Sequence, residues 1–294
     1  MKRSGLNVMA RLIGLVKPML GFMLLAIAMG LLGNLCATFI TVFGGYAILN
    51  VLHPEWSMSL GWLFAAVLLF ALARGFLRYA EQSCNHFIAF KLLALIRDKV
   101  FGALRRLCPA KLEGKDKGDL ISVITSDIEL LEVFYAHTIS PICIAFLFCL
   151  IMVLFIGRIH TALGVLALSA YAVVGIVIPL VTSKRSGDDG IQFRSSAGKL
   201  SAFVLDSLRG LPETVQYGQG RKRLAEMDAQ TDALSQTEAH MKRTAGKNTA
   251  AVNTTILLFD LAMLFLSAHL VGFEGCLIAT LAMMSSFGPV VSLA

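Results

Sequence analysis

Charged side chains are scarce in this sequence, and their scarcity excludes an ordinary water-soluble domain. Asp, Glu, Lys and Arg make up 15% of the 294 residues, whereas soluble domains carry about 25%. A soluble core of this size would need more polar cover. The apolar residues, 56% of the chain, must therefore be covered by something other than water.

Other absences exclude several kinds of site. The six cysteines form no C-x-x-C pair, so a disulfide framework is not expected and we interpret them as small apolar side chains. The six histidines include no H-E-x-x-H motif, which leaves a metal site without support. No Gly-x-x-x-x-Gly-Lys-[Ser/Thr] loop occurs, since the glycines at 187 and 190 lack the lysine. We therefore predict no catalytic or cofactor-binding residue in this chain, and no ATP hydrolysis by the chain alone.

Long uncharged runs predict helices that cross a membrane. A helix needs about 20 apolar residues to span the hydrocarbon core of a bilayer, and the longer runs here are interrupted at most once, by Asp260. The first run is too long and too rich in glycine for a removable signal peptide, so we interpret it as a retained helix. We predict spans at about 18–50, 60–80, 135–157, 160–183, 249–272 and 275–294.

The basic residues predict the orientation of these spans. Of 26 Lys and Arg residues, four precede the first span, nine lie within 78–134 and eleven within 184–247. The positive-inside rule then places the N-terminus and both long connections in the cytoplasm of a multi-pass cell-membrane protein. The net charge of +7 is thus explained by topology. Nucleic-acid binding is therefore not expected.

The long connections, at about 81–134 and 184–248, carry a helical pattern. Apolar residues recur at steps of three and four through 93–107, 121–135, 197–215 and 224–241, which predicts two hairpins of helices. Continuous helix over Gly61 to Leu107 would measure about 70 Å, more than twice the hydrocarbon thickness. The sequence therefore predicts an all-α membrane protein of six spans with two long cytoplasmic helical hairpins.

Two stretches of these hairpins resemble the type-1 transmembrane domain of ABC exporters. The segment 118–129, Gly-Asp-Leu-Ile-Ser-Val-Ile-Thr-Ser-Asp-Ile-Glu, is similar to the first intracellular loop of that family, and 206–218 to the second. Val123 stands where many members have Arg. Within the family, the run 216–218 (Gln-Tyr-Gly) and Ser140-Pro141 resemble the CydC and CydD subunits, which export thiols or haem.

The resemblance implies an exporter half whose hairpin tips, at about 108–120 and 206–217, dock on a nucleotide-binding domain. That domain is expected C-terminal to residue 294 or on a separate polypeptide, with ATP and Mg bound there. A second half-transporter, identical or different, is implied, because six spans enclose only half a path. The residues expected to couple to the ATPase are Pro109, Glu113, Gly118, Asp119, Asp206, Arg209, Gly210, Glu213 and Tyr217.

Polar residues inside the spans are candidates for a substrate pathway. A carboxylate in a span usually faces a cavity or a partner, so Asp260 is a candidate contact for cargo; the alternative is a structural pair with Arg74 or packing against hydroxyl groups. Arg74 could instead reach the membrane interface together with Arg78. Asn34 and Thr38, one turn apart, could line a polar stripe or serve helix packing.

Two other functions remain open at this stage. A transport-incompetent regulatory or scaffold protein with the same fold is the first. The second is a membrane-embedded enzyme or receptor, which would need a convergent cluster of reactive side chains within the spans; only isolated polar residues occur there.

Overall fold

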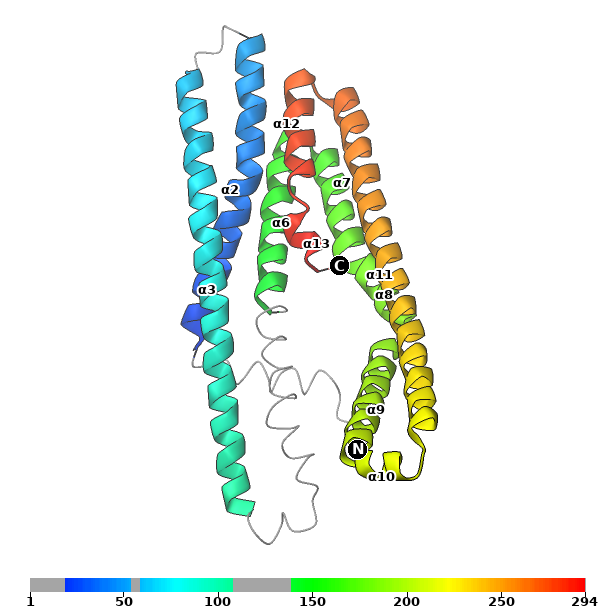
Figure 1. Ribbon diagram of the computed structural model, residues 1–294. Coiled ribbons are helices and arrows are strands. Elements are labelled where there is room, and N and C mark those ends of the chain that lie inside the picture. The colour runs from blue at the N-terminus through cyan, green and yellow to red at the C-terminus, as the bar shows by residue number, and fades with distance from the viewer. Residues whose placement is uncertain (1–18, 54–58, 108–138, 294) are drawn as a thin grey trace. The chain divides into compact units, whose positions relative to one another are not determined.

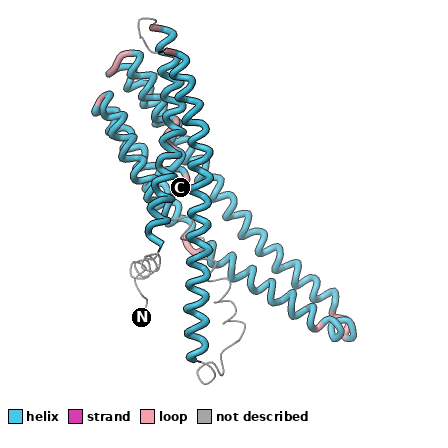
Figure 2. The backbone as a smooth tube through the Cα atoms, turned by 90° about the vertical axis from the view of Figure 1, so that its left-hand side faces the viewer, coloured by secondary structure: helices cyan, strands magenta, loops and turns pink. Residues whose placement is uncertain are grey.

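The computed structural model describes residues 19–53, 59–107 and 139–293, and every element in these ranges is a helix (Figures 1 and 2). Six of these helices are long and apolar enough to cross a membrane, so the predicted all-α membrane fold is confirmed. The first predicted coupling segment, with Pro109, Glu113, Gly118 and Asp119, lies outside the described residues. The candidate spans are Leu20–Leu52, Leu60–Leu107, Ser140–Ile159, Thr161–Ser186, Gly220–Leu270 and Phe273–Val291.

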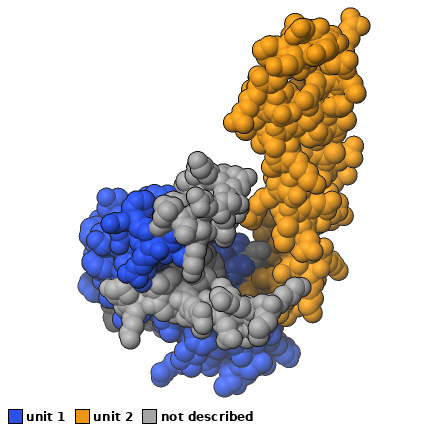
Figure 3. All heavy atoms as spheres, turned by 90° about the horizontal axis from the view of Figure 1, so that it is seen from below, with its two compact units in different colours: residues 1–171, 259–293 blue, residues 172–258, 294 orange. Residues whose placement is uncertain are grey.

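The chain divides into two units, one of residues 1–171 with 259–293 and one of residues 172–258 (Figure 3). In the first unit, α2 (Leu20–Leu52) runs alongside α3 (Leu60–Leu107) (Figure 1). Their packing buries Met23 of α2 with Ile88, Leu92 and Ile96 of α3. At 48 residues, α3 is about 72 Å long, which confirms the predicted continuous helix over Gly61 to Leu107.

A tight helical hairpin follows in the same unit. Helix α6 (Ser140–Ile159) and helix α7 (Thr161–Ala172) are separated only by His160, whose extended backbone ends α6. A Cβ on Gly164 would lie 2.7 Å from the Cα of Gly157. Two glycines therefore let the two helices approach closely, as small residues do between membrane helices.

Prolines interrupt two of the spans. The π-helix η4 (Val173–Val177) precedes α8 (Ile178–Ser186), in which Pro179 lies in the first turn. Proline removes an N–H and crowds the carbonyl four residues earlier, which favours such a local register change. The last span ends as α12 (Phe273–Met284) and restarts as α13 (Gly288–Val291), with Pro289 in its first turn. The candidate span Phe273–Val291, where a span was predicted at about 275–294, thus consists of two helices rather than one.

The second unit is dominated by a hairpin of α9 (Asp189–Arg209), the short α10 (Leu211–Gln216) and α11 (Gly220–Leu270), which continues past residue 258. The apolar pattern predicted one helix through residue 215, but Gly210 breaks it, because Pro212 in the first turn of α10 cannot continue the helical hydrogen bonds of α9. Gly218, with a φ of 66°, makes the turn into α11. An ion pair from Arg223 Nη2 to Asp206 Oδ2 at 2.8 Å joins α11 to α9, and His240 Nδ1 of α11 lies 3.5 Å from Asp189 Oδ2 of α9.

Large apolar side chains cover the outside of the predicted spans. On α3, the side chains of Trp62, Phe64, Leu68 and Phe76 are 62–70% exposed. A water-soluble monomer rarely presents such a continuous apolar surface. Exposure of this kind is expected where lipid, rather than water, surrounds the helices.

Candidate functional site: a polar cavity beside α3

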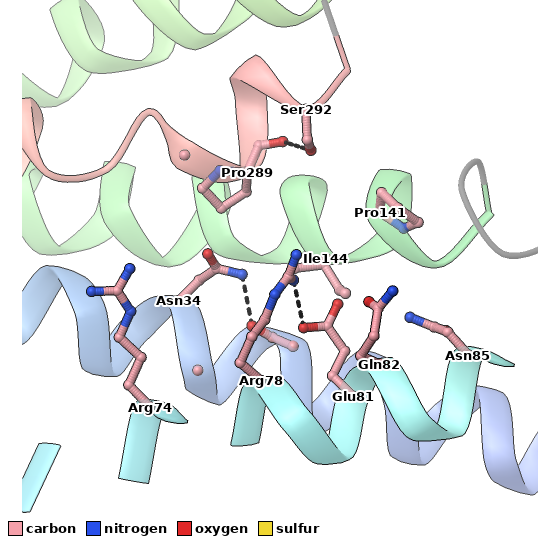
Figure 4. Close-up of a pocket in the computed structure, with 13 residues that line it drawn as sticks. Asn34, Arg74, Arg78, Glu81, Gln82, Asn85, Pro141, Ile144, Pro289 and Ser292 are labelled. Atoms are coloured by element: carbon pink, nitrogen blue, oxygen red, sulfur yellow. Dashed lines mark hydrogen bonds and ion pairs between the residues drawn. The ribbon is translucent and has the colours of Figure 1, made fainter. Parts of the chain in front are cut away.

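Five polar side chains share one side of α3. They follow each other at spacings of four, three, one and three residues, which keeps them on a single helix face. Figure 4 shows them projecting from α3 toward α6. The five are Arg74, Arg78, Glu81, Gln82 and Asn85.

These side chains line a cavity of about 460 Å³ that lies within the first unit. Helices α2, α6 and α13 supply the other walls, with Gly30, Gly33, Asn34, Pro141, Ile144, Gly288, Pro289 and Ser292. Cavities of roughly 300–1,000 Å³ accommodate small molecules. Along the axis of α3, Arg74 is about 21 Å and Asn85 about 38 Å from Leu60. With a hydrocarbon core of about 30 Å, the cavity lies toward the end of the span that continues into the long extension of α3.

Glu81 is the most buried charged residue of the cavity. It is 4% exposed, and Arg78 Nη1 donates a hydrogen bond of 2.7 Å to its Oε2. A Cβ on Gly30 would come within 2.9 Å of the Glu81 carboxyl carbon. Glycine at position 30 therefore leaves the space that the carboxylate occupies against α2.

Three further polar side chains could form hydrogen bonds or ion pairs with a molecule in the cavity. Asn34 Nδ2 donates to the carbonyl of Gly30 at 2.8 Å, which leaves its own carbonyl oxygen available. Asn85 is 7% exposed, and its amide, which points toward Gln82 in Figure 4, makes no hydrogen bond to another residue that the structure describes. Arg74 likewise has no ion-pair partner within the described ranges.

The structure brings together two of the four residues predicted for a substrate pathway. Asn34 and Arg74 line the same cavity, whereas Thr38 and Asp260 do not. Thr38 is fully buried, and its hydroxyl donates to the carbonyl of Ser285 at 3.3 Å. The spacing between Asn34 and Thr38 thus indicated a shared helix face but not a shared site.

Asp260 lies apart from this cavity. It is 8% exposed, and its Oδ1 has no hydrogen-bond partner in the described parts of the chain. The alternative of a structural pair between Asp260 and Arg74 is not found there, since Arg74 lines the cavity beside α3.

Sequence reasoning assigned no site role to Glu81, Gln82 and Asn85. They follow the end of the second span as predicted at about residue 80, where polar residues are ordinary. The signal that could have found them is their spacing from Arg74, which places all of them on one face of a helix already predicted to continue through this region.

The second hairpin carries the other predicted site. Asp206 accepts a hydrogen bond from Arg223, whose guanidinium also lies 4.9 Å from the ring centroid of Phe203. Arg209 and Glu213 are exposed, and the Gly210 carbonyl accepts hydrogen bonds from the backbone and the hydroxyl of Thr214. Around α10, the apolar residues Leu211, Val215 and Tyr217 are 52%, 70% and 73% exposed.

Comparisons with known proteins place this geometry in a family. The model of the ABC transporter transmembrane region matches residues 21–292. A probable ABC transporter ATP-binding/permease protein of Haemophilus influenzae is 40% identical over 298 residues, covering 100% of this chain and 54% of that protein. The glutathione/L-cysteine transport system ATP-binding/permease protein CydC of H. influenzae is 24% identical over 82% of this chain and 40% of its own length. CydD of Bacillus subtilis is 24% identical over 70% of this chain and 35% of its own length. The chain spans about half or less of these relatives.

Proposed function

The chain belongs to the ABC transporter transmembrane region family, and from this premise we propose that it forms half of the membrane pathway of an ATP-driven exporter. The observation that carries the proposal is the exposed apolar surface of α10, which lies between α9 and the much longer α11. Helix α11 has 51 residues and a length of about 77 Å, against a hydrocarbon core of about 30 Å.

A short helix across the tip of such a hairpin suits the transmission of force. The turns at Gly210 and Gly218 bound α10, and the ion pair of Arg223 with Asp206 ties α9 to α11 near the tip. Rigid elements carry displacements between packed parts of a protein. A partner that binds Leu211, Val215 and Tyr217 would therefore move α9 and α11 together.

The proposed partner is a nucleotide-binding domain that binds ATP and Mg. All three relatives described above are named ATP-binding/permease proteins, and each is longer than the region that this chain covers. This domain would dock on α10 and on the tip predicted at 108–120, with both hairpins in the cytoplasm as the basic residues indicate. A second half-transporter, identical or different, would complete the path.

Photocrosslinking tests the docking of α10. In the full-length protein that contains this chain, p-benzoylphenylalanine at position 217 is expected to crosslink to the ATP-binding domain, as mapped by mass spectrometry. The same label at Ile191, which is 70% exposed at the start of α9, is the control and is expected not to reach that domain. Equal crosslinking from both positions, or none from 217, would favour the regulatory or scaffold function instead.

A further inference from the structure

The cavity beside α3 has a charge pattern that selects its occupant. Two guanidinium groups and one carboxylate line it, and the 2.7 Å bond between Arg78 and Glu81 neutralises one charge of each sign. Arg74 retains its positive charge with no ion-pair partner in the described ranges. A cation in the cavity would be repelled, and an apolar solute would leave the cavity's polar groups unpaired.

The uncharged polar groups of the cavity further restrict the class of molecule that could bind there. Asn34, Gln82 and Asn85 are amides, each of which carries a carbonyl acceptor and an NH₂ donor. Asn85 is 93% buried, and its amide has no hydrogen-bond partner in the described chain. The Nε2 of Gln82 lies 3.2 Å from Nε2 of His86, so the carbonyl oxygen of Gln82 is the group left for a bound molecule. Peptide-like groups, which also carry one donor and one acceptor, complement such amides.

We infer that this cavity binds the carboxylate of an amino acid or short peptide, with Arg74 as the anion anchor and the three amides beside it. A guanidinium binds a carboxylate through two parallel N–H donors, which gives both attraction and orientation. The role of this solute as cargo rests on the proposed function, whereas its binding does not.

Calorimetric titration of the full-length protein in phosphatidylcholine nanodiscs tests the inference. The probes are the N-acetylated forms of alanine, dialanine and trialanine, each as the free acid and as the C-terminal amide, so that the amides carry no charge. The acids are expected to bind about tenfold more tightly than the amides, because one charge-assisted contact of about 1.4 kcal/mol changes affinity tenfold. Arg74→Gln is expected to abolish this preference for the acids, while Arg74→Lys keeps part of it.

Arg158→Gln is the matched control, because Arg158 is exposed on α6 and does not line the cavity. It is expected to bind every probe like the wild type. Equal binding of acids and amides, or no binding of any probe, would overturn the inference. So would a preference for acids that survives Arg74→Gln.

Lipid supplies the competing source of an anion. If added phosphatidylglycerol raises the melting temperature of the wild type but not of Arg74→Gln, and no free acid does so, the occupant is a lipid headgroup and the inference fails. ATP hydrolysis, measured on the same preparation, separates the two proposals. Without hydrolysis the exporter function fails, while a preference for acids that depends on Arg74 would still support the cavity assignment.

Discussion

At the scale of single residues, proline chemistry explains the position of Thr38. Pro289 has no N–H, so it cannot donate to the carbonyl of Ser285 four residues earlier. The hydroxyl of Thr38, which is fully buried, donates to that carbonyl at 3.3 Å. A polar residue that the sequence suggested for a substrate pathway thus satisfies a backbone group at a break in the last span.

Thr38→Val is expected to destabilise the protein by about 1–3 kcal/mol, the cost of leaving a buried acceptor without a donor. Thr38→Ser keeps the hydroxyl and is expected to cost less, although it removes a methyl group. Thermal unfolding in detergent measures both. Equal losses in the two variants would show that packing, not the hydrogen bond, determines the choice of threonine.

Arg78 and Glu81 are expected to affect the stability of the protein as a coupled pair. Arg78 has a side chain that is 67% exposed, whereas that of Glu81 is 6% exposed. The attraction itself therefore contributes only about 0–1 kcal/mol. The larger effect is the cost of a buried carboxylate without its donor.

Arg78→Gln is accordingly expected to destabilise the protein by about 1–3 kcal/mol, and the double variant Arg78→Gln/Glu81→Gln to recover most of that loss. Melting temperatures of the wild type, both single variants and the double variant complete the cycle. If the two single losses simply add in the double variant, the two residues are not coupled.

At the scale of helices, glycine spacing sets how closely α6 and α7 pack. Gly164→Ala would bring its Cβ within 2.7 Å of the Gly157 Cα and 3.2 Å of the Val153 carbonyl oxygen. Because these neighbours are backbone atoms, the helices themselves must move. A Cβ on Gly157 meets the Gly164 Cα at 3.7 Å, an ordinary contact.

This asymmetry gives a matched pair of variants. Gly164→Ala is expected to lower stability by about 1–3 kcal/mol through overpacking, whereas Gly157→Ala is tolerated. Unfolding midpoints in detergent test the difference. Similar midpoints for the two variants would contradict the close approach of the helices at Gly164.

Helices were easier to predict from the sequence than their interruptions. Uncharged runs and apolar steps of three and four indicated α3 and α11 as long helices. The same apolar steps pass through Gly210, where the structure breaks the helix between α9 and α10. The neighbouring proline was the available signal, and it outweighs apolar spacing because it removes a hydrogen bond that spacing cannot replace.

Sites were harder to predict, because they depend on how separate helices align. The face shared by Arg74 and Asn85 follows from spacing along one helix. That Asn34 joins them depends on the register of α2 against α3, which no local pattern determines. The predicted tip of the second hairpin, at about 206–217, includes α10, but the domain that docks on it stays a prediction.

At the scale of the whole molecule, the exposed apolar surface of the spans, the long extensions of α3 and α11 and the family membership describe a multi-pass membrane protein. We propose that ATP binding by the nucleotide-binding domain docked at the hairpin tips changes how the membrane helices pack. On the predicted outer side, His53 at the end of α2 and Glu274 at the start of α12 lie 3.8 Å apart, from Nε2 to Oε1. These positions would separate when the path opens outward.

The most direct test of this claim is the distance between positions 53 and 274 in the full-length protein. Spin labels at His53→Cys and Glu274→Cys, in a background from which all native cysteines, including the six of this chain, are removed, would be followed by electron paramagnetic resonance before and after trapping with ATP and vanadate. We expect strong spin–spin broadening without nucleotide and its loss after trapping. Unchanged spectra would contradict ATP-driven switching of these helices.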